Sequence, residues 1–152
     1  MPKEIEFKFA SPNDSPGYLL GQATLAWQRQ QRKVLDPLNL THTQFTLLAA
    51  LGWLAKTNDA VTQTDIARQS KSDTMMVSKV LRTLEAKNYL SRKEHPVDTR
   101  AKVIALTEAG AEILQRALKA VEDTDTDFFS VLGQDLAVFN RCLERLSGPA
   151  GE

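Results

Sequence analysis

The sequence of 152 residues is poor in cysteine and histidine, with one cysteine, Cys142, and two histidines. A single cysteine forms neither an intramolecular disulfide nor a thiolate metal cluster, so nothing in the chain indicates an oxidising compartment. The sequence also lacks the apolar run of roughly 18 residues that a bilayer-spanning helix requires, and its start has no continuous apolar stretch like that of a signal peptide. These absences predict a cytoplasmic protein without membrane contact.

Motifs of the common enzyme classes are absent as well. The chain contains no glycine-rich phosphate loop, no nucleophile elbow, no His-Glu metal motif and no paired carboxylates in an apolar setting. The two histidines, His42 and His95, are far apart in the sequence and have no Cys or carboxylate cluster at ligand spacing, which argues against a metal site. We therefore expect a protein that is not an enzyme and that holds no metal or cofactor.

The net charge is zero, but the charges are unevenly distributed along the chain. Residues 68–102 carry nine Lys and Arg against four acidic residues, whereas residues 105–152 carry four against nine. A basic segment followed by an acidic one is typical of a protein in which only the first faces a polyanion. The middle of the chain is therefore the segment most suited to nucleic acid.

The segments on either side of this basic region are predicted to be an N-terminal arm and long apolar-faced helices. Residues 1–16 contain three prolines and predict an N-terminal arm. Residues 17–40 and 107–147 carry apolar side chains at helical spacing, with helices expected to end before Pro37 and at Gly133. Apolar residues in the last helix alternate in steps of three and four, the spacing of a seam against another helix.

Residues 41–106 predict two helices that begin with capping boxes. Thr41 with Gln44 starts the first, and Thr62 with Asp65 starts the second, which is short. A turn of four residues then leads to a third helix and a hairpin, expected at residues 74–87 for the helix and 89–94 with 102–106 for the strands. The predicted fold class is mainly α with a small β-hairpin wing.

A short helix, a turn, a basic helix and a basic hairpin form, in this order, a winged helix-turn-helix. The helix enters the major groove of double-stranded DNA and reads base edges, while the hairpin contacts phosphates or the minor groove. Each part alone is a weak signal, but the combination is specific. The favoured function is therefore sequence-specific DNA binding in transcriptional regulation.

The same residues resemble the MarR (multiple antibiotic resistance regulator) family of bacterial transcription factors over nearly the whole chain. The resemblance rests on LTHTQFTLLAAL, TQTDIARQ and the run SDTMMVSKVLRTLEAKNYLSRKEHPVDTRAKVIALTEAG. In the last run, Asp98 and Arg100, followed by Leu-Thr-Glu-Ala-Gly, look like the family's wing signature. Two residues depart from the pattern: Lys71 stands where glycine is common in the turn, and Asn88 where glycine often ends the recognition helix. Asn88 is expected to take the left-handed conformation of a helix cap, which asparagine tolerates.

The resemblance implies a homodimer in which residues 17–40 and 107–147 form a helical dimerisation region and residues 41–106 form the DNA-binding domain. It implies a repressor of a pseudo-palindromic operator and permits release by a small aromatic or phenolic effector. A twofold axis is needed to read two half-sites about one helical turn apart. The alternative is that the same apolar faces close a monomeric helical core.

Polar and basic residues of the third helix and the hairpin are the candidate DNA contacts. Met75 is included because its side chain suits contact with a thymine methyl group, and His95 because it suits a phosphate. A solvated helix face would carry similar residues. The candidates are Ser72, Thr74, Met75, Ser78, Lys79, Arg82, Arg92, His95, Arg100 and Lys102.

At the tip of the hairpin, Arg100 has two compatible roles. It forms an ion pair with Asp98 that stiffens the wing, or it inserts into a narrow, A·T-rich minor groove. Asp98 is accordingly expected to shape the wing. An exposed ion pair contributes only about 0 to 1 kcal/mol, so a purely stabilising role for Arg100 is the weaker explanation.

Aromatic residues suggest a possible effector pocket, formed by Trp27, His42, Phe45 and Trp53. Aromatic side chains at helical spacing also suit an ordinary core. Cys142 lies on an apolar helix stripe, where a buried hydrophobic role is favoured over a redox sensor.

The alternative function is a helical protein-interaction scaffold without DNA binding. The two functions differ in one measurable property, because binding to duplex DNA weakens steeply with salt and a scaffold binds no duplex.

Overall fold

The computed structural model describes residues 1–148 and confirms the predicted fold class. Its two strands pair antiparallel, from Leu90 opposite Leu106 to Glu94 opposite Lys102. Short 3-10 turns link some of the helices and are labelled η1 (Pro12–Asp14), η2 (Asp36–Leu38) and η3 (Ser130–Asp135). The main elements are α1 (Pro16–Leu35), α2 (His42–Leu54), α3 (Gln63–Ser70), α4 (Thr74–Ala86), β1 (Leu90–Glu94), β2 (Lys102–Leu106), α5 (Glu108–Phe129) and α6 (Leu136–Ser147).

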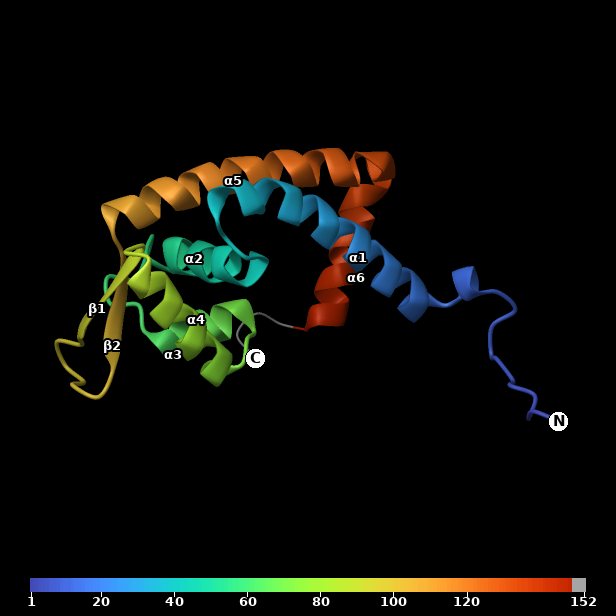
Figure 1. Cartoon of the computed structure of the whole chain (residues 1–152), viewed down its shortest axis with the longest axis horizontal. Coiled ribbons are helices and arrows are strands. Elements are labelled where there is room, and N and C mark those ends of the chain that lie inside the picture. The colour runs from blue at the N-terminus through green and yellow to red at the C-terminus, as the bar shows by residue number, and fades with distance from the viewer. Residues whose placement is uncertain (149–152) are drawn as a thin grey trace.

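Two long helices, α1 and α5, pack against each other along one side of the molecule (Figure 1). Below the first half of α5 lie α2, α3, α4 and the β1–β2 hairpin, which we call the lobe. The hairpin extends from the lobe on the side away from α5, and the N-terminal arm extends from the opposite end of the molecule (Figure 1). The architecture therefore separates a compact lobe from an elongated helical part.

The hydrophobic core lies inside the lobe and below α5. Fully buried side chains come from α2, α3 and α4, so these three short helices share one core with the start of α5. Burial of such side chains contributes about 1.5–3 kcal/mol each and is the main source of the lobe's stability. The largest of these residues are Leu47, Leu48, Leu51, Ile66, Val77, Leu81 and Leu84.

Both predicted capping boxes are present and fix the helix starts. Thr41 accepts the amide of Gln44 at 3.1 Å and the Gln44 side chain accepts the amide of Thr41 at 3.1 Å. Thr62 and Asp65 make the same reciprocal pair at the start of α3. Each cap is worth about 1 kcal/mol, so short helices such as α3 are held at defined positions.

Two non-glycine residues in the left-handed region end α3 and α4. Lys71 has φ 50° and Asn88 has φ 64°. After α3, the amides of Lys71 and Ser72 donate to the carbonyls of Arg68 and Ala67, which is the Schellman arrangement. The expectation for Asn88 is confirmed, and the helix-turn-helix bend forms although Lys71 replaces the usual glycine.

The start of α5 is locked to the hairpin. Thr107 Oγ1 donates to the carbonyl of Asn88 at 2.6 Å and accepts the amide of Gly110 at 2.9 Å. A Cβ atom on Gly110 would lie 1.8 Å from the carbonyl oxygen of Tyr89, so this close approach requires glycine. The position of the wing is therefore fixed relative to the long helix.

Helix α6 differs from the other helices because it packs mainly against the turn that precedes it. Within residues 1–148, none of its side chains is buried, and Val138 and Leu146 are exposed. Cys142 is exposed too, so the prediction of a buried thiol is wrong for the single chain. The physical reason is that no element of residues 1–148 covers the apolar stripe of α6.

Candidate nucleic-acid interface

Helix α4 is held in the lobe by one face and exposes the other. Asp73 caps its first turn by accepting the amide of Met76 at 3.0 Å. Val77, Leu81 and Leu84 are buried, as their spacing of three and four residues requires. The remaining side chains of α4 are therefore fixed in direction by the packing beneath them.

The exposed face of α4 is basic and polar. Lys79 and Arg82 are exposed, lie three positions apart on the same side, and form no ion pair within residues 1–148. Thr74 is exposed, and Met75 leaves 82% of its surface in solvent at the first turn. Uncommitted donors and one apolar side chain near a helix N-terminus suit the reading of base edges.

Two serines flank this face and are half-buried. Ser72, in the turn before α4, donates its hydroxyl to the carbonyl of Ser70 at 3.2 Å. Ser78 lies between the buried stripe and the exposed residues of α4. Both serines are partly exposed, so their hydroxyl groups are available to accept a hydrogen bond from a ligand.

The wing tip is organised by short hydrogen bonds around two side chains. Asp98 Oδ1 accepts the amide of Arg100 at 3.0 Å and lies 3.6 Å from Arg100 Nε. His95 Nδ1 accepts the amides of Val97 and Asp98, both at 3.1 Å. An accepting Nδ1 places the proton of neutral His95 on Nε2, which stays available as a donor.

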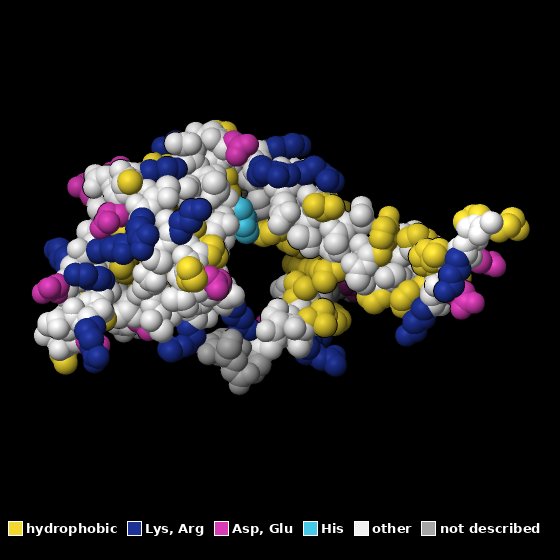
Figure 2. Space-filling model, turned by 60° about the horizontal axis from the view of Figure 1, so that its bottom comes forward, with side chains coloured by type: hydrophobic (Ala, Val, Ile, Leu, Met, Phe, Trp, Pro, Cys, Tyr) yellow, Lys and Arg dark blue, Asp and Glu magenta, His cyan; other side chains and the backbone are white. Residues whose placement is uncertain are grey.

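The basic side chains of the wing, Arg100 and Lys102, are exposed to solvent and therefore accessible to a ligand. The Arg100 side chain is 94% exposed, and its ion pair with Asp98 holds only the Nε edge of the guanidinium. Lys102 is exposed at the start of β2, opposite Glu94 in the hairpin. Seen from the side of the lobe away from α5, dark blue Lys and Arg side chains gather over this part of the molecule (Figure 2).

Arg92 is placed differently from the expectation. Its side chain is only 19% exposed, and its Nε lies 3.8 Å from Glu85 Oε1 on α4. Side chains alternate along a strand, so Arg92 shares the face of buried Leu90 and is directed toward the lobe. We therefore leave Arg92 out of the set of DNA-contacting residues proposed below.

Three of the four predicted pocket aromatics lie together where α1, α2 and α5 meet. The rings of His42 and Trp27 form a T-shaped pair with centroids 5.0 Å apart, and the centroid of the Phe45 ring lies 6.5 Å from that of His42. Burial lowers the pKa of His42 below its ordinary value, and the nearby carboxylate of Asp125 partly opposes this. His42 is therefore neutral at neutral pH.

Sequence reasoning missed the polar centre of this junction. Trp27 Nε1 and the amide nitrogen of Gln31 both donate to Asp125 Oδ1, at 2.8 and 2.7 Å. Gln31 is fully buried, and within residues 1–148 its Oε1 atom has no hydrogen-bond partner. These residues are more than 90 positions apart, so no local pattern links Asp125 to α1.

Trp53, the fourth predicted pocket residue, lies at the other end of α2 and is 62% exposed. Lys56 Nζ lies 4.6 Å from the centre of its ring, within the range of a cation–π contact. The four aromatics therefore belong to two separate places. The prediction of one shared pocket is wrong, because Trp53 lies 11 positions after His42 on α2, a rise of about 16 Å along the helix.

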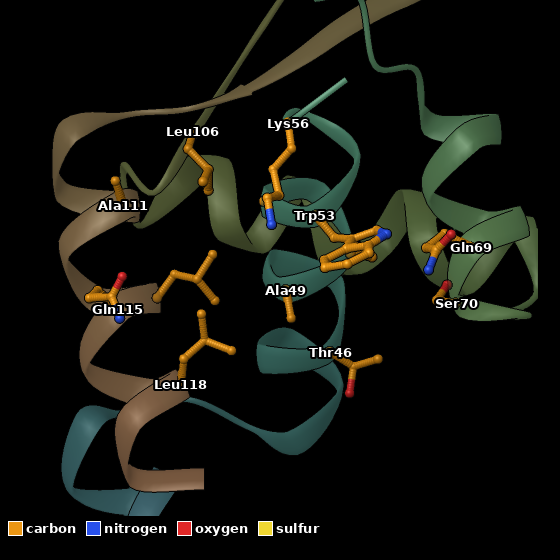
Figure 3. Close-up of a pocket in the computed structure, with 13 residues that line it drawn as sticks. Thr46, Ala49, Trp53, Lys56, Gln69, Ser70, Leu106, Ala111, Gln115 and Leu118 are labelled. Carbon is orange, nitrogen blue, oxygen red and sulfur yellow. The ribbon is translucent and has the colours of Figure 1, made fainter. Parts of the chain in front are cut away.

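A hollow of about 660 Å³ opens beside Trp53, between α2 and α5 (Figure 3). Leu106 and Leu118 form part of its apolar wall, and Lys56 and Gln115 add polar groups (Figure 3). The end of α3, at Gln69, completes the lining. A ligand in this hollow would contact both the long helix and the helix that precedes the turn to α4.

Among the helices of residues 1–148, none combines the length and the apolar composition of a membrane-spanning segment.

Comparison with known proteins places this geometry in a family. The MarR family model matches residues 40–102. An uncharacterized HTH-type transcriptional regulator of Bacillus subtilis, YdcH, is 45% identical over 127 residues, which cover 84% of this chain and 86% of that protein. The fold resembles the transcriptional repressor CouR bound to a 23-mer DNA duplex, with a TM-score of 0.82, 26% identity and coverage of 95% of this chain and 100% of the other.

A mutant MarR from Escherichia coli in complex with operator DNA has the same fold, with a TM-score of 0.77, 23% identity and coverage of 86% of this chain and 91% of that one. The family model covers the lobe up to the start of β2, and the Bacillus relative extends the similarity over most of the chain. The chain therefore belongs to the MarR family of DNA-binding, winged helix-turn-helix transcriptional regulators.

Proposed function

We propose that the protein is a homodimeric repressor that binds a pseudo-palindromic operator and represses transcription by occluding the promoter. The observation that carries the proposal is the set of exposed cations on α4 and the wing, namely Lys79, Arg82 and Arg100. Helix α4 would enter the major groove, and Arg100 would contact phosphate or the minor groove. Ser72, Thr74, Met75, Ser78, His95 and Lys102 are proposed as further contacts.

A homodimer is supported by apolar side chains that the single chain leaves in solvent. They lie on α1, near η3 and on α6, outside the lobe, and hydrophobic side chains gather in this region (Figure 2). Exposed apolar patches of this extent mark an interface, and a closed monomeric core would have buried them. The residues are Tyr18, Leu19, Leu20, Leu25, Val131, Leu136, Val138 and Leu146.

The proposed dimer region consists of residues 17–40 and 107–147, and residues 41–106 form the DNA-binding part. A twofold axis would space two lobes so that both α4 helices reach the same face of the duplex, about 34 Å apart. In the dimer, the apolar stripe of α6 that carries Cys142 would pack against the second chain, which would cover the thiol. The division also explains the uneven charge, because the basic residues fall in the lobe and the acidic ones mostly in α5 and α6.

We further propose that a small planar aromatic acid regulates DNA binding from the hollow between α2 and α5. Trp53 offers a ring face, Lys56 a cation, and Leu106 and Leu118 an apolar wall. CouR from Rhodococcus jostii has been crystallised with p-coumaroyl-CoA, and DNA binding by BpsR of Bordetella bronchiseptica is regulated by 6-hydroxynicotinic acid. Contact with Gln69 would connect the ligand to the helix-turn-helix.

The DNA-binding proposal is tested by replacing Arg82 with alanine and measuring affinity for a duplex selected by the wild-type protein. A lost contact to a base edge should weaken specific binding by about 1–3 kcal/mol per site, with little change in non-specific binding. Arg29→Ala, a change of equal charge at an exposed position of α1, is the matched control. Equal affinities of the Arg82 variant and the wild type would exclude this role.

The effector proposal is tested by titrating benzoate and 4-hydroxybenzoate while following tryptophan fluorescence and operator affinity. Binding in the hollow should quench the fluorescence of Trp53, and Lys56→Ala should weaken binding because the carboxylate loses its cation. Trp53→Phe removes the signal from the hollow, whereas Trp27→Phe preserves it. A fluorescence change that disappears in the Trp27 variant would assign the ligand to the junction of α1, α2 and α5 instead.

A further inference from the structure

The side chain of Lys71 connects the helix-turn-helix to the end of α6. Its Nζ donates to the carbonyl oxygens of Ser147 at 2.7 Å and Gly148 at 3.0 Å. Ser147 is the last residue of α6, and Gly148 is its C-cap. An ammonium group at a helix C-terminus meets unpaired carbonyls and the negative end of the helix dipole, so two favourable effects coincide at this contact.

The backbone conformation of Lys71 is unfavourable for lysine. Its φ of 50° and ψ of 41° lie in the left-handed region, which disfavours every side chain with a Cβ atom. Glycine would form the same turn without that cost. Lysine at this position therefore makes the turn less stable than glycine would. In exchange for glycine's freedom, its side chain makes hydrogen bonds to the end of α6 that glycine cannot make.

The contact matters because α6 is otherwise connected loosely to the lobe. The main contacts of α6 are with η3, at the far end of α5 (Figure 1). A hollow of about 890 Å³ lies between Lys71 and residues 140–148, which are the end of α6 and its C-cap. The Lys71 side chain crosses this hollow from the turn before α4 to the end of α6. It therefore joins the lobe directly to α6, which is otherwise connected to the lobe through α5 and η3.

We propose that Lys71 is a positioning residue that sets the spacing of the two recognition helices in the dimer. The inference rests on the proposed function, in which α6 belongs to the dimer interface and α4 reads the operator. Lys71 lies three residues before the first residue of α4, so holding it against α6 restricts bending of α5 and η3, which would move the lobe relative to the dimer region. A lobe held in this way reads half-sites at one separation only.

The test compares Lys71 variants on duplexes that differ only in the separation of their half-sites. The probes are the inverted repeat recovered from a random pool by the wild-type protein and versions with one base pair added or removed at the centre. Each added base pair moves a half-site by about 3.4 Å and rotates it by about 35°. The measured quantity is the ratio of affinities for the original and the altered spacing.

Lys71→Met keeps the aliphatic stem and removes the cation, and it should reduce the spacing ratio roughly 3- to 10-fold, as expected for charge-assisted hydrogen bonds in solvent. Lys71→Arg keeps the cation and should retain most of the wild-type ratio. Lys71→Gly should raise the melting temperature, because the left-handed backbone is relieved, and should still lose the spacing preference. If Lys71 acted only through the turn, Lys71→Gly would instead preserve the spacing ratio.

Asn88→Gly is the matched control, because it relieves another left-handed position, at the end of α4, where Asn88 makes no hydrogen bond to α6 among the described residues. It should leave the spacing ratio unchanged. A chain ending at Leu146 should lower the ratio as Lys71→Met does, and the two changes combined should lower it no further.

Unchanged spacing ratios in Lys71→Met and Lys71→Gly would overturn the inference, as would additive effects of Lys71→Met and the truncation. Failure of the proposed function is recognised separately, since the wild-type protein itself would then select no inverted repeat.

Discussion

Replacing Arg100 with alanine should weaken DNA binding most strongly at low salt. The Arg100 side chain is 94% exposed, and its one ion pair, 3.6 Å from Asp98, leaves most of the guanidinium free. Such an exposed pair contributes only about 0 to 1 kcal/mol to folding, so the melting temperature should change by a few degrees at most. The loss should therefore appear in binding and hardly in stability.

The magnitude follows from counterion release. Each lost phosphate contact lowers the slope of log affinity against log salt by about 0.9, and a dimer loses two such contacts, or about 1.8 in total. Over a fourfold rise in salt, from about 50 to 200 mM, the advantage of the wild type over the variant should shrink about 12-fold. Fluorescence anisotropy with a labelled operator at four or five salt concentrations measures both slopes.

Arg116→Ala provides the control, because Arg116 is exposed on α5 outside the lobe and its loss changes the net charge equally. The slope of this variant should match that of the wild type. If Arg100 enters a minor groove, its loss should also relax the preference for A·T pairs beside the half-site. An Arg100 variant with an unchanged slope and unchanged A·T preference would refute the assignment of the hairpin as a DNA-contacting wing.

Two further predictions concern stability. Gly110→Ala forces a methyl group against the carbonyl oxygen of Tyr89, 1.8 Å away, and should destabilise the protein by about 2–3 kcal/mol in urea denaturation. Gly52→Ala should destabilise the protein less, since its only close contact, at 2.8 Å, is with the flexible end of the Leu114 side chain, and Leu106 lies at an ordinary 3.8 Å. Equal losses of stability in the two variants would contradict the locked junction. Burial lowers the pKa of His42 in the folded state, so the unfolded chain binds a proton first and the unfolding free energy should fall as pH drops below about 6.5. His42→Phe should flatten this dependence between pH 7 and 5, and parallel profiles would exclude the explanation.

Features encoded by short segments were predicted well. Both capping boxes, the left-handed Asn88 and the antiparallel hairpin appear where the sequence indicated, because each depends on residues within a few positions of one another. The exposure of Lys79 and Arg82 follows from the spacing of the buried stripe of α4. Alternation along β1 also contained the information that Arg92 faces inward, but the basic composition of the segment obscured it.

Features that depend on distant segments were not predictable. Asp125 reaches Trp27 and Gln31 across more than 90 positions, and no periodicity in α5 distinguishes it from its acidic neighbours. The contact from Lys71 to the end of α6 is equally remote. The exposure of Cys142 has a different cause, because an apolar stripe indicates burial without saying whether its own chain or a second one covers it.

The most direct measurement is selection of bound duplexes from a random pool by the wild-type protein, followed by native mass spectrometry of the selected complex. Two lobes that each insert α4 into the major groove should enrich an inverted repeat with half-site centres about 10 base pairs apart and give two chains per duplex. A pool without enrichment, or a complex of one chain on an asymmetric site, would contradict a dimer that reads DNA through α4 and the wing.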